Sequence, residues 1–316
     1  MTHTIPELVD IPATGDGPAS VHLFDKASAW AVLAALAANR PLLVRGEPGV
    51  GKSQLARAAA VWLKRPILSI VVDSRTESHD LLASFDAVQR LARAQIGSAI
   101  RDENTESLLA VENFLHPGKL WWAFDWVGAE KQARVAKAPV PICPPGSDPS
   151  NGCVVLIDEI DKAESDLPNG LLEALGSGSF PVRGREAPVE VVGPHPLVVV
   201  TTNEDRVLPN AFLRRCLVLY IELPPDGDEL KQHLVQRGRA HFQGMSTDLL
   251  ERVAEMLVEE RKEARARHIR PLPGQAEYLD LLRAVDRLSV ARSLDPAAVL
   301  DEVSGFVLKK NLGAPI

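Results

Sequence analysis

The chain has 316 residues, of which 46% are hydrophobic and 24% are charged, and this ordinary usage excludes a disordered, collagenous or coiled-coil protein. A formal net charge of −7 argues against broad, charge-driven binding to nucleic acid. No apolar run reaches the ~18–20 residues that a membrane span needs. The N-terminal residues lack the pattern of a signal peptide, and the three cysteines have no C-x-x-C spacing, so we expect a cytoplasmic protein.

The first two-thirds of the chain has the pattern of an α/β fold. Residues 1–24 contain prolines and glycines with little periodicity, so they are expected to form a loose lead-in. Helices are predicted at residues 25–38 and, in an alanine-rich stretch, at 55–63. Apolar, largely β-branched runs predict five buried strands, at residues 41–44, 67–72, 154–157, 197–200 and 217–221. Such strands alternating with helices indicate a five-stranded parallel sheet with helices on both faces.

The last third of the chain has a different pattern. Strand-like runs stop at about residue 225, and apolar residues then recur at helical spacing. We therefore predict an α/β core over residues 25–225, followed by a small all-helical lid domain over residues 226–316. The span from Lys52 to Asp158 is about twice the ~50 residues that a helix, strand, helix and their loops require, which predicts an insertion at about 98–152. Five prolines at 139–149 indicate an exposed, mobile loop within it.

A glycine-rich loop follows the first predicted strand of the sheet. Its eight residues match G-x-x-x-x-G-K-[ST], and they are Gly46, Glu47, Pro48, Gly49, Val50, Gly51, Lys52 and Ser53. Glycines let the backbone N–H groups point into the loop and hold anionic oxygens, and the following helix adds the positive end of its dipole. Lys52 is expected to reach the β- and γ-phosphates of a nucleotide, and the Ser53 hydroxyl to bind Mg²⁺.

Polar side chains also follow two later strands. Asp158 and Glu159 come directly after the strand at 154–157, at the strand end where α/β sheets place their sites. Asp158 is expected to bind Mg²⁺ with Ser53, and Glu159 to orient and deprotonate an attacking water. Asn203 ends the strand at 197–200 and could hydrogen-bond that water or the γ-phosphate, although asparagine also commonly begins a turn.

Two adjacent arginines, Arg214 and Arg215, precede the fifth strand. An arginine supplied within the subunit or by a neighbour can stabilise the charge on phosphoryl oxygens. Taken without its surroundings, this pair would be interpreted as two solvated surface residues. Its position after the loop, the acidic strand end and the asparagine makes a catalytic role the better interpretation.

These features, in this order, resemble the AAA+ ATPases, and the resemblance covers residues from about 25 to 316. Segments 118–123 and 208–215 and a predicted hairpin at 180–183 and 189–192 resemble the MoxR-like branch, in the helix-2-insert group that is distantly similar to magnesium-chelatase ATPase subunits. The resemblance implies a homo-oligomeric ring, commonly a hexamer, that hydrolyses ATP with Mg²⁺. Glu159 and Asn203 would act within the subunit, and Arg215, or else Arg214, on the neighbour's ATP. A protein partner with a von Willebrand factor A domain is also implied.

The chain departs from this branch at the lid. The usual lid arginine lies in an S-P-R-A segment, whereas residues 271–277 here read PLPGQAE. Either Arg270 substitutes from the preceding position or this function is missing.

Two other functions stay open for the whole protein. One is a slowly hydrolysing, nucleotide-dependent switch or scaffold, and the other is a nucleic-acid-associated or GTP-using motor subunit. The acidic composition counts against the motor.

Overall fold

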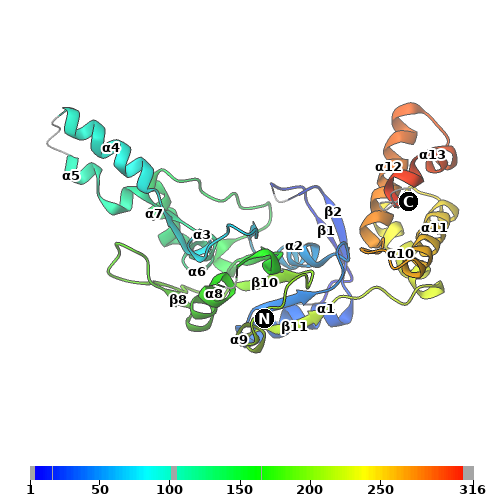
Figure 1. Ribbon diagram of the computed structural model, residues 1–316, viewed down its shortest axis with the longest axis horizontal. Coiled ribbons are helices and arrows are strands. Elements are labelled where there is room, and N and C mark those ends of the chain that lie inside the picture. Colours follow the sequence, from blue (N-terminus) through cyan, green and yellow to red (C-terminus); the bar gives the residue numbers. More distant parts are fainter. Residues whose placement is uncertain (1–3, 16, 101–104, 165, 309–316) are drawn as a thin grey trace.

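A five-stranded parallel sheet forms the centre of the molecule, as predicted (Figure 1). The computed structural model describes residues 4–15, 17–100, 105–164 and 166–308. The strand order is β11-β3-β10-β7-β4, with crossovers between strands that are not consecutive in the chain. The strands are β3 (Leu42–Arg45), β4 (Ile67–Val71), β7 (Val154–Asp158), β10 (Leu197–Thr202) and β11 (Leu217–Tyr220).

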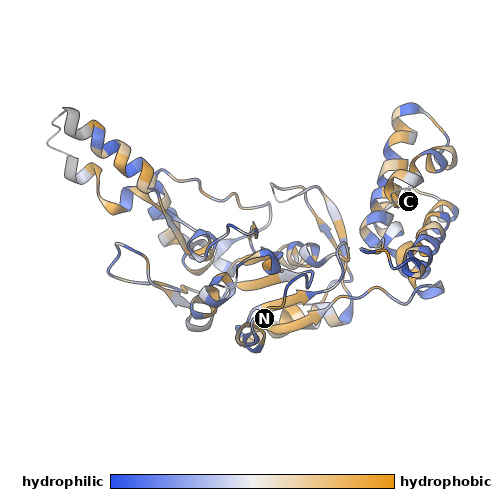
Figure 2. Ribbon diagram, in the orientation of Figure 1, coloured by the Kyte–Doolittle hydropathy of each residue, from blue (hydrophilic) through white to orange (hydrophobic). Residues whose placement is uncertain are grey.

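Alternate residues of the central strands enter two separate cores, one on each face of the sheet. On the first face, Leu42 and Val44 pack with α1 (Lys26–Ala38) and α2 (Lys52–Leu63). The small alanines of α2 are almost completely buried and let this helix lie close to the sheet. This burial on both faces explains why the strands are continuously apolar (orange in Figure 2).

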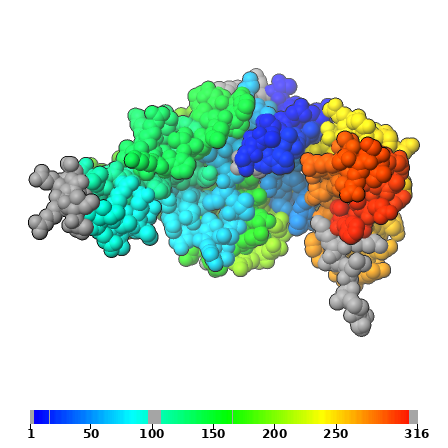
Figure 3. Space-filling view, turned by 90° about the horizontal axis from the view of Figure 1, so that it is seen from above, coloured from blue at the N-terminus to red at the C-terminus, as the bar shows by residue number. Residues whose placement is uncertain are grey.

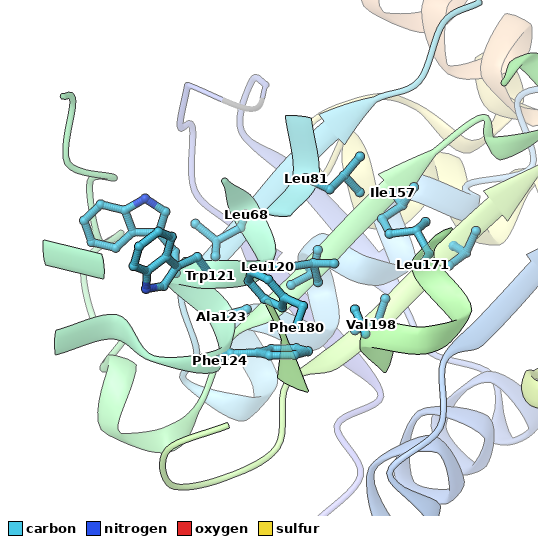
Figure 4. Packing of buried hydrophobic residues seen from close by; sticks show 14 of the residues in the cluster. Leu68, Leu81, Leu120, Trp121, Ala123, Phe124, Ile157, Leu171, Phe180 and Val198 are labelled. Carbon is cyan, nitrogen blue, oxygen red and sulfur yellow. The ribbon is translucent and has the colours of Figure 1, made fainter. Parts of the chain in front are cut away.

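The second face of the sheet is covered by a core rich in aromatic residues (Figure 4). Helices α6 (Lys119–Phe124) and α7 (Trp126–Ala136) lie on this face with α8 (Asp166–Ser177) and α9 (Asn210–Arg215). Trp121 is completely buried, and the rings of Trp122 and Trp126 pack edge to face with centroids 5.1 Å apart. Large aromatic rings bury much apolar area each, so this cluster anchors α6 and α7 to the sheet.

The expected loose lead-in instead contains a β-hairpin. Strand β1 (Leu8–Ile11) pairs antiparallel with β2 (Ser20–Leu23). Val9 and Ile11 face inward and pack in the same core as α1 and α2. The strands have only four residues each, so their alternation was too short to predict from the sequence.

The expected insertion at about 98–152 corresponds to two segments with different structures. The segment that projects from the core begins before residue 98 and spans residues 83–117. It lies at the end of the molecule opposite the C-terminal helices (Figures 1 and 3). It consists of β5 (Ala83–Phe85), α4 (Ala87–Ile100), α5 (Thr105–Leu108), the 3₁₀ turn η1 (Val111–Phe114) and β6 (Leu115–Pro117). The proline-rich part is tied to the end of α2, because the backbone N–H of Asp148 donates to the Lys64 carbonyl at 3.0 Å. A short 3₁₀ turn, η2 (Pro149–Asn151), follows it.

A second hairpin precedes β10, in the predicted region. Its strands β8 (Ser179–Phe180) and β9 (Val189–Glu190) are shorter than expected. Pro181 lacks a backbone N–H and cannot continue the ladder, which is consistent with β8 ending at Phe180.

Four helices form the C-terminal domain, and none of the helices in the described ranges is long and apolar enough to cross a membrane. They are α10 (Asp228–His241), α11 (Thr247–Ala266), α12 (Gln275–Arg292) and α13 (Pro296–Leu308). Their apolar faces build a third core, separate from the two cores of the sheet. The domain contacts the sheet domain through α10, where the Arg237 guanidinium donates to the Leu23 carbonyl at 2.6 Å.

Candidate functional site

A pocket of about 350 Å³ lies where the carboxyl ends of β7 and β10 meet the N-terminus of α2. Helix α12 of the C-terminal domain forms its outer wall. The residues that line it are Pro48, Gly49, Gly51, Lys52, Ser53, Gln54, Asp158, Glu159, Thr201, Asn203, Gln275, Ala276, Leu279, Asp280 and Arg283. The structure thus brings together in one pocket the predicted side chains of Lys52, Ser53, Asp158, Glu159 and Asn203.

The loop from Gly46 to Gly51 connects β3 to α2, and its glycines are required by its conformation. Gly46 has φ +149°, and a Cβ there would lie 2.2 Å from the Ile221 carbonyl oxygen. Gly51 adopts a left-handed conformation with φ 98° and caps α2 without a side chain. The N–H groups of the first turn of α2 therefore face the pocket unblocked by a side-chain cap, as an anion-binding site requires.

Lys52 lies at the centre of the pocket, and its side chain is nearly buried. The ammonium donates to the carbonyl oxygens of Gly46 and Glu47 at 2.8 and 2.9 Å and to Asn203 Oδ1 at 2.7 Å. Burial lowers the pKa of Lys52, although Asp158 and other nearby carboxylates act in the opposite direction. All three ammonium protons have partners, so a bound anion would replace one of these acceptors.

Ser53 and Asp158 place three oxygens side by side. The Ser53 hydroxyl donates to the two Asp158 carboxylate oxygens at 2.7 and 2.9 Å. Thr201, on the neighbouring strand β10, donates from its hydroxyl to Asp158 Oδ1 at 2.5 Å. Hydroxyl and carboxylate oxygens at the mouth of a phosphate-binding loop are the donors that Mg²⁺ prefers, so these residues fit that ion.

Glu159 directly follows β7 and is held in an unusual conformation. Its φ of 61° lies in the left-handed region, and its backbone N–H donates to Thr201 Oγ1 at 2.9 Å. Its carboxylate accepts from Lys162 Nζ at 2.5 Å and from Asn203 Nδ2 at 3.4 Å. A left-handed non-glycine residue at a strand end is a feature of strained functional sites.

Asn203 connects the lysine to the glutamate. Its Oδ1 accepts from Lys52, and its Nδ2 donates to Glu159. Its position is fixed by Asp161, which is 2% exposed and accepts from the backbone N–H groups of Asn203 and Asp205 at 3.4 and 3.0 Å. Thr201, Asp161 and Lys162 belong to no sequence motif that would have identified them as site residues.

The other loop residues have different surroundings. Pro48 and Gly49 line the pocket, whereas Val50 is buried below it. The Glu47 side chain points instead toward the C-terminal domain, where it pairs with Arg261 at 3.4 Å and Arg270 at 3.6 Å. A Cβ on Gly49 would lie 2.8 Å from Cβ of Ala276 on α12. The loop and the C-terminal domain are therefore in direct contact.

The wall that α12 forms contains Arg283, and not Arg270, which the sequence suggested. Arg270 does not line the pocket, and its side chain is 77% exposed. Arg283 does line it, on α12, where it pairs with Asp280 at 2.5 Å. Ala276, Leu279, Asp280 and Arg283 follow i, i+3, i+4 and i+7 spacing, so one face of α12 forms this wall. The spacing alone shows that these residues share one face of a helix. Only the position of α12 beside the pocket shows that this face lines it.

Arg214 and Arg215 lie at the amino end of β11, whereas the pocket lies at the carboxyl ends of β7 and β10. Both are exposed at the end of α9, and neither lines the pocket. The Arg40 guanidinium, just before β3, donates to the Arg215 carbonyl at 2.9 Å and also to the Arg214 carbonyl. The glycine-rich loop begins at the other end of β3, about 13 Å away for four strand residues. The pair is therefore separated from the pocket of its own chain.

One family model matches the part of the chain that forms most of this pocket. The model of the AAA domain (dynein-related subfamily) matches residues 41–237. A search of curated proteins gives no match. Among solved structures, a protein of Cytophaga hutchinsonii ATCC 33406 that is assigned as an ATPase is 12% identical, with a TM-score of 0.38, over 89% of this chain and 79% of that chain. Because the family model spans more than half of the chain, the chain belongs to the AAA domain family, in the dynein-related subfamily.

Proposed function

We propose that this chain hydrolyses ATP as a MoxR-like AAA+ protein and works as an oligomeric ring, commonly a hexamer, that remodels a protein partner. The observation that carries the catalytic part is the convergence of Lys52, Asp158, Glu159 and Asn203 on one pocket at the N-terminus of α2. A phosphate-binding loop, a pair of carboxylates and an amide in one pocket are the parts that phosphoryl transfer to water requires.

The loop is proposed to bind the phosphates of ATP. Its glycines and the first turn of α2 present backbone N–H groups to the β-phosphate. Lys52 exchanges at least one of its three present contacts for phosphate oxygens, which are stronger acceptors because they are charged. Ser53 and Asp158 would hold Mg²⁺, which neutralises phosphate charge when it is bound.

Glu159 is proposed to be the general base. In-line attack of water on the γ-phosphate forms a new P–O bond, breaks the bond to ADP, and transfers the water proton to the Glu159 carboxylate. Asn203 lies between Glu159 and Lys52, where its amide can orient both the base and the γ-phosphate. Preorganised donors of this kind supply much of the rate enhancement in such sites.

The arginine for this reaction is proposed to come from a neighbouring subunit. Arg215, or alternatively Arg214, is exposed at the amino end of β11, away from the chain's own pocket. We propose that a head-to-tail ring brings this part of one subunit to the pocket of the next. On the lid, we propose that Arg283 rather than Arg270 contacts the nucleotide, because Arg283 lines the pocket. The suggested protein partner carries a von Willebrand factor A domain.

Two substitutions separate nucleotide binding from hydrolysis and test this proposal. Glu159→Gln keeps the phosphate-binding loop, so ATP affinity should stay within about threefold while turnover falls by about 10²–10⁴. Lys52→Ala should lose most of its ATP affinity. Binding is followed with a fluorescent ATP analogue and turnover by phosphate release. Wild-type turnover in Glu159→Gln, or wild-type affinity in Lys52→Ala, would contradict the assignment.

A further inference from the structure

Lys162 makes a contact with Glu159 that the proposed reaction does not use. Lys162 ends the 3₁₀ turn η3 (Ile160–Lys162), and its Nζ lies 2.5 Å from Glu159 Oε2. The other carboxylate oxygen, Oε1, lies 3.4 Å from Asn203 Nδ2. Both oxygens of Glu159 therefore already accept hydrogen bonds from this chain.

The contact is built into the local backbone and does not depend on a neighbour. The Lys162 backbone N–H donates to the Glu159 carbonyl at 3.0 Å, which closes the turn. The left-handed conformation of Glu159 and its bond to Thr201 fix the other side of the turn. A residue three positions away is thus held beside the carboxylate in every subunit.

We propose that Lys162 is a positioning residue that restrains Glu159 in the resting subunit. This inference rests on the proposed function, because it assumes that Glu159 accepts the proton of the attacking water. The Lys162 ammonium already donates to Oε2 of Glu159, so it competes with the attacking water for that carboxylate oxygen. The contact therefore lowers the resting rate of turnover.

The second contact of Glu159 links this restraint to the nucleotide. Asn203 donates to Glu159 and accepts from Lys52 through the same amide. A γ-phosphate competes with Asn203 Oδ1 for the Lys52 ammonium, so binding of ATP loosens the contact between Asn203 and Lys52. ATP does not replace the contact between Lys162 and Glu159, so this ion pair remains as a restraint on the carboxylate.

The expected size of the restraint is small. The side chains of Lys162 and Glu159 are 48% and 31% exposed, and ion pairs near the surface are weak. Loss of such a pair corresponds to a rate change of about two- to fivefold. A restraint of this size slows an isolated subunit without preventing turnover.

The test compares Lys162→Met, which removes the charge and keeps the side-chain stem, with Lys162→Arg, which keeps the charge. Lys262→Met is the matched control, because Lys262 pairs with Glu259 at 3.5 Å, also three residues apart, on the exposed side of α11. Turnover of ATP, KM and the Kd of a fluorescent ATP analogue are measured at a protein concentration that saturates the wild-type rate. Lys162→Gln repeats the neutral substitution with a different side chain.

We expect kcat to rise about two- to fivefold in Lys162→Met and Lys162→Gln, with KM and Kd within twofold of wild type. Lys162→Arg should restore nearly the wild-type kcat, and Lys262→Met should not change it. An unchanged or lower kcat in both neutral variants, with an active wild type, would overturn the inference and leave the ATPase assignment intact. If wild type and every variant show only the Lys52→Ala background, the proposed function fails, and the inference fails with it.

Discussion

At the scale of single residues, Thr201 contacts both acidic residues of the site, Asp158 through its carboxylate and Glu159 through its backbone N–H. Its side chain is completely buried at the end of β10. The hydroxyl donates to Asp158 Oδ1 at 2.5 Å and accepts from the Glu159 backbone N–H at 2.9 Å. One hydroxyl thus orients the proposed metal ligand and the proposed base, and neither role requires contact with the nucleotide.

Thr201→Val should therefore reduce turnover without unfolding the protein. Valine has nearly the same shape, but it leaves Asp158 Oδ1 without one donor and the Glu159 N–H without its acceptor. Loss of such an outer contact costs about 10–100-fold in metal affinity or activity. The measurement is kcat over a Mg²⁺ titration, with Thr201→Ser as the control that keeps the hydroxyl. Equal activity of the valine and serine variants would contradict this role.

The sequence predicts the residues of the site unequally, and the reason is physical. Lys52 and Ser53 lie at fixed positions of the glycine-rich motif after β3, and Asp158 ends β7. Parallel strands bring their carboxyl ends together, so these residues meet. Thr201 depends on the register between β10 and β7, in which Val200 lies opposite Ile157. That register is set by the whole sheet. Arg283 depends on how the C-terminal domain docks, which no local pattern encodes.

At the scale of elements, the C-terminal domain depends on a close approach between α10 and α12. Gly238 on α10 faces Tyr278 of α12, and a Cβ there would lie 2.6 Å from the tyrosine hydroxyl and 2.9 Å from Leu250 Cδ2. Tyr278 is completely buried, and its hydroxyl donates to the Leu250 carbonyl at 3.1 Å. A larger residue at position 238 would force this pair apart.

Gly238→Ala should therefore destabilise the protein, although alanine is the better helix former. Overpacking of a dense core costs about 1–3 kcal/mol, which exceeds the gain of up to about 1 kcal/mol from helix propensity. Gly305→Ala on α13 is the matched control, because a Cβ there meets nothing within 4 Å, and it should stabilise the protein slightly. Urea unfolding measures both changes. A stabilisation of the same size in both variants would refute the packing argument.

The elements themselves were predictable where their patterns were long. The five apolar runs became the five strands of the sheet, because burial on both faces requires continuous apolar sequence. The hairpin of β1 and β2 was not predicted, since four residues give no periodicity. The projecting segment at 83–117 was not delimited by the sequence, because β5 and β6 have three residues each and the sequence between them is polar and alanine-rich.

At the scale of the whole molecule, the junction between the sheet domain and the C-terminal domain contains three histidines with lowered pKa values. Burial, with Arg237 second, lowers the pKa of His22 on β2 to about 4. Burial is also the main reason that the pKa values of His233 and His241 on α10 are lowered. The junction therefore stays neutral at these positions, next to the Arg237 contact with Leu23.

Acidification should weaken this junction. In the unfolded chain a histidine takes up a proton near pH 6.5, whereas folded His22 does so only near pH 4. The contribution of neutral His22 to the free energy of unfolding is therefore complete above about pH 6.5 and is lost as the pH falls toward 4. The loss is up to about 2 kcal/mol at pH 5. Urea unfolding at pH 7.5 and pH 5 measures this loss, and His22→Gln should reduce it. An equal loss in wild type and His22→Gln would show that other groups cause it.

The proposed assembly also belongs to this scale. The pocket holds the phosphate-binding loop, the carboxylates and the amide, whereas Arg214 and Arg215 lie at the amino end of β11 and do not line it. A single chain would therefore lack the arginine, and activity should require contact between subunits. This dependence would join the site within one chain to a ring of several chains.

The most direct test is ATP turnover per subunit over a wide range of protein concentration, with Lys52→Ala as the background and sizing at the same concentrations. We predict a rate per subunit that climbs with concentration and levels off as the oligomer forms. A rate above background that stays constant while sizing shows a monomer would contradict sites completed between subunits. A rate that never exceeds the Lys52→Ala background at any concentration would contradict the proposed hydrolysis itself.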